Sequence, residues 1–304
     1  MCATASPPPT GRFAPSPTGP LHLGSLLAAV GSWLSARSRG GRWLVRIEDL
    51  DTARVIPGSA EAILESLARY GLEWDDAPVR QSERTALYED AVRALRSRGR
   101  AFDCSCTRAD LQRSASAPAP GDEGGLVYPG RCRNGAAGPA RSTRFLVREG
   151  IIGFDDAIAG HVEQNVAGEV GDFVIRRADG PFAYQLAVVV DDADQGVTEV
   201  VRGGDLLSST ARQIALQRVL GIPTPAYAHL PLLVDASGAK LGKRGGALPL
   251  PSLDSSEVVR TLALALSLLG IDAIEPSSPE RMLRDALASF DVAKVPSGTV
   301  AVSK

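Results

Sequence analysis

The chain has 304 residues, 44% of them hydrophobic and 22% charged, which is typical of a globular protein with a sizeable core. A formal net charge of −2 gives no global argument for nucleic-acid binding, so any such surface would have to be a local patch. The longest apolar run, residues 262–271, is too short to cross a bilayer, and residues 1–10 lack the layout of a signal peptide. We therefore expect a cytosolic protein with a disordered lead.

The first hundred residues alternate between extended and helical patterns. A short strand is expected over residues 11–16, then a helix from Leu23, whose apolar residues recur at helical spacing. The compact apolar run Trp43–Ile47 predicts a buried strand. Further helices are expected from Pro57 and over about residues 83–98. Strand, helix, strand and helix in this order indicate a parallel sheet.

The pattern changes after residue 100. Residues 101–142 are rich in Ala, Pro, Ser and Gly, and the low-complexity piece at 114–125 is typical of a flexible loop. Strands are expected over residues 144–147 and 172–176. We interpret this region as an insertion that interrupts the sheet.

The apolar, β-branched run at residues 184–190 predicts a central strand. A helix over residues 208–220 follows, and residues 255–304 carry one helix and a second at about 279–290. Two acidic clusters are interpreted as groups that orient arginines and helix starts, with a metal site as the alternative: Asp49 with Asp51, and Asp191 with Asp192.

The expected fold class is therefore α/β, a parallel sheet split by an insertion and followed by a short helical tail. The expected units are a disordered lead (1–10), the first half of the catalytic domain (11–100), the insertion (101–183), the second half (184–250) and the helical tail (251–304).

Two stretches are suited to binding a nucleotide. Residues 11–25, GRFAPSPTGPLHLGS, pass through a Pro- and Gly-rich turn to His22 and Gly24 at the start of a helix, where N–H groups attract phosphates. Residues 240–244, KLGKR, hold two of the chain's four lysines, which favours a need for compact point charges. Chance placement in a basic turn is the alternative.

Three of the four cysteines, Cys104, Cys106 and Cys132, lie in one stretch. The C-x-C pair can hold one ion and Cys132 lies across a loop, but tetrahedral zinc needs a fourth ligand. No histidine is close in sequence, and His161 is the nearest. Three reduced cysteines without a metal are the alternative.

Residues 11–25, the string RIEDLD at 46–51 and KLGKR at 240–244, in this order, resemble the class I glutamyl-tRNA synthetase family over about residues 11–250. The resemblance implies a Rossmann-type parallel sheet split by a zinc-bearing insertion. It equates the string HLGS, at residues 22–25, with the family's HIGH signature, and KLGKR with its KMSKS loop.

The resemblance implies that the α-carboxylate of L-glutamate attacks the α-phosphorus of ATP, giving glutamyl-adenylate and pyrophosphate. Fixed donors and cations lower the barrier by stabilising charge on the phosphate oxygens. His22 and Lys243 would be catalytic, and His22, Gly24, Lys240 and Lys243 would bind ATP. Gly242 stands where serine is usual, and Mg²⁺ would arrive with ATP.

The resemblance also implies a glutamate pocket. It would be lined by Arg12, Phe13, Ala14, Pro15, Ser16, Glu48, Tyr184 and Arg202. Arginine pairs bidentately with carboxylates, and Glu48 would take the ammonium group. Taken singly, surface ion pairs are the alternative for the two arginines, and a salt bridge at the end of a strand is the alternative for Glu48.

A paralogue group within this family carries a tyrosine zinc ligand, so the resemblance implies that Tyr128 completes a site for one Zn²⁺ with Cys104, Cys106 and Cys132. Strings at residues 184–192 and 201–207 are similar to that group. Only 60 residues follow Arg244, which are too few for the anticodon-binding region of full-length family members.

That paralogue group activates glutamate without tRNA and transfers it to the queuosine base in the anticodon of tRNA(Asp). The implied partners are thus ATP, L-glutamate and queuosine-containing tRNA(Asp), with no membrane, and we expect a monomer. Arginines around the insertion contact RNA phosphates or are simply solvated. Two alternatives stay open: a truncated synthetase that charges the tRNA 3′ end, and a catalytically dead, zinc-containing RNA-binding protein.

Overall fold

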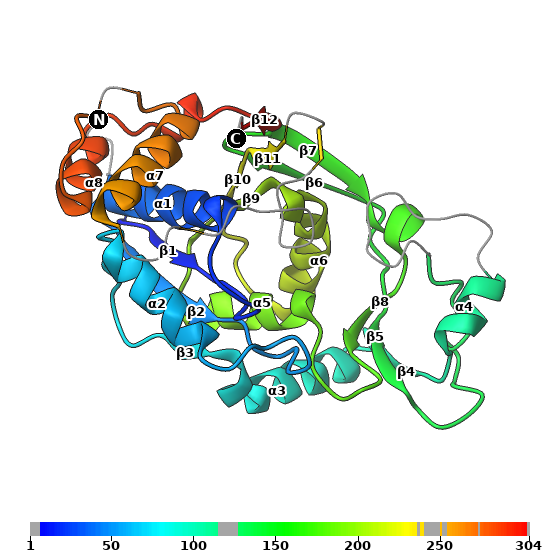
Figure 1. Cartoon of the computed structure of the whole chain (residues 1–304). Coiled ribbons are helices and arrows are strands. Elements are labelled where there is room, and N and C mark those ends of the chain that lie inside the picture. The colour runs from blue at the N-terminus through cyan, green and yellow to red at the C-terminus, as the bar shows by residue number, and fades with distance from the viewer. Residues whose placement is uncertain are drawn as a thin grey trace.

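The computed structural model describes residues 7–114, 127–235, 238–239, 250, 254–272 and 274–302. Its centre is a parallel sheet (Figure 1). Strands β1 (Thr10–Phe13), β2 (Arg42–Ile47) and β3 (Val79–Arg80) pair in parallel in that order. This arrangement confirms the parallel pairing predicted for the first hundred residues.

The second half of the sheet lies beside the first. Strand β9 (Glu199–Gly203) pairs in parallel with β10 (Ala226–Leu230). The Thr198 amide, just before β9, donates to the Thr10 carbonyl oxygen at 2.9 Å, and the Thr10 amide donates to Thr198 Oγ1 at 2.9 Å. The layer therefore runs β3-β2-β1-β9-β10, and segments almost 190 residues apart meet at its middle.

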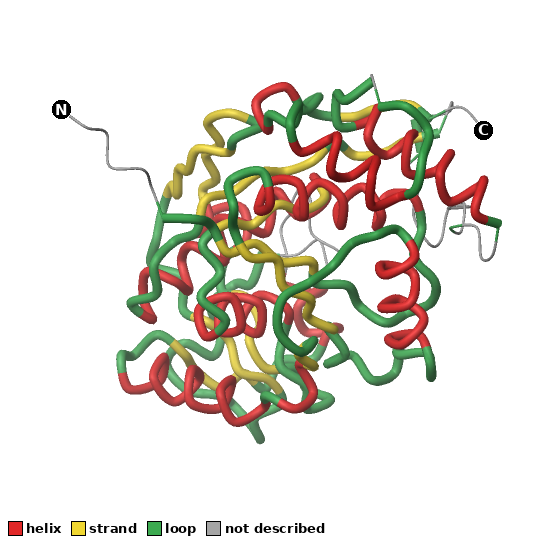
Figure 2. Tube along the Cα trace, turned by 90° about the vertical axis from the view of Figure 1, so that its left-hand side faces the viewer, coloured by secondary structure: helices red, strands yellow, loops and turns green. Residues whose placement is uncertain are grey.

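Helices cover both faces of this sheet (Figures 1 and 2). One hydrophobic cluster joins the strands to the helices of the first face: α1 (Leu23–Arg37), α2 (Ser59–Arg69), α7 (Ser255–Leu268) and α8 (Pro279–Leu287). A second cluster involves α3 (Thr85–Ser97), α5 (Tyr184–Asp194) and α6 (Thr210–Leu220). Helix α1 is buried on nearly all sides, because the strands lie on one side of it and α7 and α8 on the other.

The strand expected over residues 184–190 is wrong, because these residues form the first part of α5. Leu186, Ala187, Val188 and Val189 are all buried against α3, α6 and their neighbours. A helix that is enclosed on several sides shows the same uninterrupted apolar run as a central strand, and periodicity does not separate the two. The pair Asp191 and Asp192 accordingly lies in the last turns of a helix rather than at a strand end.

The insertion forms one antiparallel sheet of its own and adds two strands to the main sheet. Strands β4 (Ala101–Cys104), β5 (Ser142–Phe145) and β8 (Phe173–Arg176) are antiparallel, and α4 (Arg108–Ser114) follows β4. The hairpin of β6 (Ile151–Asp156) and β7 (Gly160–Asn165) extends the main sheet, because Asp156 of β6 pairs with Tyr227 of β10.

The tail contributes a strand as well as the two predicted helices. Strand β12 (Thr299–Ala301) pairs in parallel with β11 (Leu232–Val234). Short helical turns complete the described structure at Gln81–Glu83, Val166–Val170, Gly204–Ser209 and Val292–Lys294. Among the described residues, no helix combines the length and the apolar character needed to cross a membrane.

Candidate active site

A cleft of about 730 Å³ opens where β1, β2 and β9 end. Carboxyl ends of parallel strands are the usual place for a ligand site in such folds. Seven of the eight residues predicted for glutamate binding line this cleft: Arg12, Phe13, Ala14, Ser16, Glu48, Tyr184 and Arg202. The eighth, Pro15, lines an adjoining hollow.

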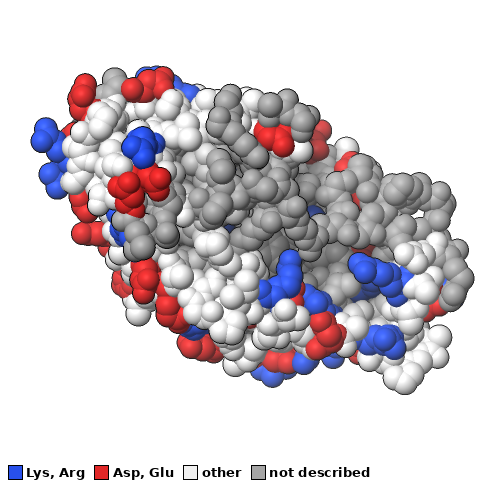
Figure 3. Space-filling model, viewed as in Figure 1, with Lys and Arg blue, Asp and Glu red and all other residues white. Residues whose placement is uncertain are grey.

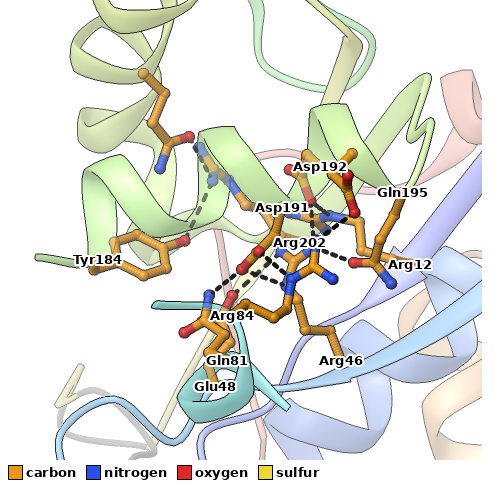
Figure 4. Close-up of polar contacts among 12 residues, drawn as sticks. Arg12, Arg46, Glu48, Gln81, Arg84, Tyr184, Asp191, Asp192, Gln195 and Arg202 are labelled. Atoms are coloured by element: carbon orange, nitrogen blue, oxygen red, sulfur yellow. Dashed lines mark hydrogen bonds and ion pairs between the residues drawn. The ribbon is translucent and has the colours of Figure 1, made fainter. Parts of the chain in front are cut away.

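An ion-pair network lies at the base of the cleft (Figure 4). Arg46 of β2 is fully buried and pairs with Asp192 at 2.8 Å and with Glu48 at 3.3 Å, and Gln195 accepts a hydrogen bond from it at 2.8 Å. Burial alone would lower the pKa of Arg46, but attraction to Asp192, Glu48 and Asp191 raises it, so the guanidinium stays charged. Asp192 also accepts from Arg12 Nε at 3.1 Å.

The neighbouring Asp191 ties α5 to the start of α3. Its carboxylate accepts from Arg84 Nε at 2.7 Å, from Gln81 Nε2 at 2.7 Å and from the Tyr88 hydroxyl at 2.8 Å. The interpretation that the acidic pair orients arginines is confirmed for both aspartates. In the other acidic cluster, Asp49 accepts from the Ser82 amide and hydroxyl and Asp51 from Arg54 and Arg177.

Glu48 is a largely buried carboxyl group that lines the cleft. Its side chain is 8% exposed, and burial raises its pKa to about 7, although Arg46 and Arg12 act in the opposite direction. A cation bound in the cleft would lower the pKa of Glu48, because the added positive charge favours the ionised form of the carboxyl group.

Arg202 supplies a buried positive charge that no acidic side chain of the described structure pairs. Its Nε donates to His229 Nε2 and its terminal nitrogens to Gln213 and Thr210, all at 2.8–2.9 Å. Its contacts to the Tyr184 hydroxyl and the Leu206 carbonyl oxygen are longer, at 3.4 and 3.3 Å. The two N–H groups making these longer contacts are therefore the ones a ligand oxygen would take over most readily.

Arg12 presents a second set of donors. Only its Nε has a hydrogen-bond partner among the described residues, namely Asp192, so its two terminal amino groups remain for a ligand. Around the ends of β1, β2 and β9, the cleft thus places the guanidinium groups of Arg12 and Arg202 opposite the carboxyl group of Glu48, while other charged side chains, among them Asp51 and Asp205, also line it. Arg54 and Arg177 also line the cleft. On the face shown in Figure 3, several basic side chains lie to the right of the centre of the molecule.

The adjoining hollow, of about 340 Å³, lies at the start of α1 and shares Phe13, Ala14 and Ser16 with the cleft. His22 is the N-cap residue of α1, and its Nδ1 accepts from the Ser25 amide at 3.2 Å. At Gly24 a Cβ would lie 3.2 Å from the imidazole ring, so a side chain there would press against His22.

The predicted lysines of the nucleotide site, Lys240 and Lys243, lie outside the described residues, as does Gly242. The described residue Leu250 donates its amide to the Leu21 carbonyl oxygen at 3.0 Å, next to His22.

Three cysteines and a tyrosine gather in the insertion. The Sγ atoms of Cys104, Cys106 and Cys132 lie within 4.8 Å of one another, and the last two are 3.7 Å apart. Tyr128 Oη lies 3.5 Å from Cys104 Sγ and 3.9 Å from Cys106 Sγ. With zinc–sulfur bonds of about 2.3 Å, two thiolates of a tetrahedral site lie about 3.8 Å apart, so these side chains fit a zinc ion.

Charged side chains pack around the three cysteines and Tyr128. The Arg144 guanidinium stacks over the Tyr128 ring at 4.1 Å from its centre, and Arg133 pairs with the buried Asp172 at 2.7 Å. Burial alone would raise the pKa of the Cys132 thiol, but hydrogen bonds from Tyr128 and Ser105 lower it to about 6. A thiolate is the form that binds metal.

Comparison of the chain with known proteins shows the family to which it belongs. Residues 10–272 match the family described as tRNA synthetases class I (E and Q), catalytic domain. A relative from Aromatoleum aromaticum, named Glutamyl-Q tRNA(Asp) synthetase, is 54% identical over 272 residues, covering 89% of this chain and 84% of its own length. A protein of the same name from Neisseria meningitidis is 50% identical over 293 residues, 94% of this chain and 97% of its own.

A solved structure agrees with both. The crystal structure of a glutamate tRNA ligase from Elizabethkingia meningosepticum in complex with its amino acid superimposes with a TM-score of 0.78 at 28% identity. The match covers 97% of this chain and 67% of that one. The chain is therefore a ligase that belongs to the class I tRNA synthetase family for glutamate and glutamine, alongside the members named Glutamyl-Q tRNA(Asp) synthetase.

Proposed function

We propose that this enzyme activates L-glutamate with ATP in the absence of tRNA. The observation that carries the proposal is the charge arrangement of the cleft, where Arg12 and Arg202 face the space also lined by Glu48. L-glutamate has two carboxylates and one ammonium group, so it matches these three groups in number and sign. Tyr184 and Ser16 also line the cleft.

ATP would occupy the adjoining hollow, with its phosphates at the N-terminus of α1 beside His22 and Gly24. An α-carboxylate oxygen of glutamate attacks the α-phosphorus, and the bond to the pyrophosphate oxygen breaks. Mg²⁺ bound with ATP would neutralise part of the phosphate charge. Lys243 and Lys240 keep the roles predicted from the sequence: they would stabilise the leaving pyrophosphate.

The second step that we propose is transfer to a hydroxyl of the queuosine base in the anticodon of tRNA(Asp). The hydroxyl oxygen attacks the carbonyl carbon of glutamyl-adenylate, an ester forms, and AMP leaves. The names of the two bacterial relatives support this acceptor. A base extruded from an RNA loop can reach an atom at the bottom of a cleft, as in other enzymes that act on bases.

The insertion would carry one Zn²⁺, held by Cys104, Cys106, Tyr128 and Cys132. Four protein ligands leave no open position, so the ion would brace the loop and would not act on substrate. We also propose that residues 11–100 and 184–250 form the two halves of the catalytic domain around this insertion and that the enzyme works in the cytoplasm.

ATP–pyrophosphate exchange without tRNA tests the first step, with glutamate, aspartate and glutamine compared. We expect exchange with glutamate but not with aspartate or glutamine. If glutamate supports no exchange at high enzyme and ATP concentrations, the proposal is refuted. Nuclease mapping of tRNA(Asp) labelled with radioactive glutamate tests the second step. Label on the anticodon base is expected, whereas label on the terminal adenosine would establish charging of the 3′ end instead.

A further inference from the structure

Behind Arg202 lies a buried chain of polar groups that the predicted site does not include. Arg202 of β9 and His229 of β10 are direct neighbours in the parallel register. Arg202 Nε donates to His229 Nε2 at 2.9 Å, and His229 Nδ1 contacts Asp156 Oδ2 at 2.6 Å. Asp156 ends β6, so this chain of contacts begins in the insertion and ends at the cleft.

The donors around Asp156 fix its charge. Its Oδ1 accepts from the backbone amides of Ile158, Ala159 and His229 at 2.8–3.1 Å. Burial alone would raise the pKa of Asp156, but the hydrogen bonds from His229 and these amides lower it to about 2. Both carboxylate oxygens are therefore acceptors at neutral pH.

The same contacts fix the tautomer of His229. Its Nδ1 must carry the proton, because it faces a carboxylate oxygen, and its Nε2 must be the acceptor, because an arginine Nε–H can only donate. Burial lowers the pKa of His229, which also favours the neutral ring. The imidazole is thus neutral, with one N–H directed at Asp156.

A neutral imidazole can hold the Arg202 guanidinium group without neutralising its charge, which a carboxylate at this position could not do. A carboxylate would hold Arg202 but would also cancel its charge and compete with the substrate. His229 holds the guanidinium by Nε, while Asp156 keeps its negative charge one ring further from the cleft. The positive charge of Arg202 therefore stays available to the substrate in a fixed orientation.

We propose that His229, held in its tautomer by Asp156, is a positioning residue that orients Arg202 for a carboxylate of glutamate. This inference rests on the proposed function, because it needs glutamate to contact Arg202. It also gives the insertion a role in amino-acid recognition through Asp156.

The two amide replacements of His229 separate positioning from mere packing. In His229→Gln, the side-chain oxygen can reach the place of Nε2 and accept from Arg202. In His229→Asn, the shorter amide can contact Asp156 but does not reach Arg202. We expect H229N to raise the KM for glutamate about 10- to 100-fold, since a hydrogen bond to a charged group is lost, with the KM for ATP unchanged. H229Q should stay within about threefold of the wild type by the same argument.

Exchange kinetics without tRNA, at matched thermal stability, provide the measurement. Equal KM values for glutamate in H229N and H229Q, or parallel rises in the KM for glutamate and ATP, would overturn the inference while leaving the proposed function intact. A wild-type enzyme that fails to exchange with glutamate would overturn both. If H229N does not fold, Asp156→Asn serves in its place, because an amide N–H facing Nδ1 forces the proton onto Nε2. The same selective rise in the glutamate KM is then expected, and an unchanged value would contradict the inference.

Discussion

At the scale of single residues, the cleft is organised by charges that constrain one another. Arg46 is enclosed by Asp192, Glu48 and Asp191, and each aspartate also holds a second arginine. Removing one member of such a buried set leaves its partners charged and unpaired, which is more costly than losing a surface ion pair.

Replacement of Arg46 by methionine tests this network. We expect R46M to lower the free energy of unfolding by about 3–5 kcal/mol, because the buried Glu48 would lose its paired cation and Asp192 would keep only Arg12. Arg42→Met is the control on the same strand. Arg42 is half exposed and pairs with Asp76, so its loss should change the free energy by less than about 1 kcal/mol. Urea unfolding of both variants gives the comparison, and equal losses would contradict a special role for Arg46.

The raised pKa of Glu48 predicts a pH dependence for glutamate binding. The folded enzyme holds this carboxyl with a pKa of about 7, so it is half protonated near that pH. An ammonium group binds the ionised form, so binding should release a proton, and the KM for glutamate should fall about tenfold between about pH 6 and about pH 8. Calorimetry in buffers of different ionisation enthalpy measures the proton release.

Glu48→Gln provides the control for this titration. Its KM should be high and should not vary with pH over this range. The same shift has a stability consequence of defined sign: a carboxyl whose pKa is raised on folding stabilises the protein below the unfolded value, and this contribution disappears as the pH rises through about 7. Glutamate affinity that is independent of pH in the wild type would show that Glu48 does not meet the ammonium group.

At the scale of elements, the sequence predicted the helices better than the strands. The α1 and α2 patterns were recognisable from apolar spacing and from Pro57. The helix α5 was missed because it is enclosed, and β9 was missed because its charged Glu199 and Arg202 are buried by partners from other elements. Such partners are separated by long stretches of sequence, so local patterns do not reveal them.

The same limit applies to the cleft. Motif resemblance identified the side chains that line it, because they belong to short contiguous strings. The groups that hold the network in place come from other segments. His229 contacts Arg202, Asp156 contacts His229, and Gln81 contacts Asp191, and only the fold brings these partners together. The single sequence signal was the Asp191–Asp192 pair, since adjacent carboxylates in an apolar run need cations.

Two leucines on α7 test how the tail supports the catalytic sheet. Leu262 is fully buried in the cluster that contains α1, whereas Leu264, two positions on, is 41% exposed. Leu262→Ala should lower the free energy of unfolding by about 2–5 kcal/mol, and Leu264→Ala by less than about 1 kcal/mol. Thermal or urea unfolding measures both, and similar losses would mean that α7 does not pack as described.

At the scale of the whole molecule, the two halves of the chain depend on each other through the sheet. The Thr10–Thr198 bonds join β1 to β9, and β12 of the tail pairs with β11, which lines the hollow beside His22. The insertion enters the same sheet through β6. Described residues of both halves of the sheet, of the insertion and of the tail therefore contribute to the walls or the support of the cleft.

Metal content tests the contribution of the insertion. Protein purified without chelator should contain about one zinc per chain, as expected for a single four-ligand site. Cys132→Ser should lose most of it, whereas Cys2→Ser, far away in the sequence, should retain it. Atomic absorption gives the ratio, and zinc below about one-tenth per chain in the wild type would reject the site.

The unneutralised guanidinium of Arg202 has a consequence for selectivity. Glutamine has nearly the same size and shape as glutamate, so packing alone would separate the two poorly. Glutamine in the cleft would leave one largely buried cation facing a neutral amide, without the counterion that the carboxylate of glutamate supplies. Selection of glutamate over glutamine would thus depend on a guanidinium group that has no acidic partner among the described residues of the cleft and that only a negatively charged side chain neutralises.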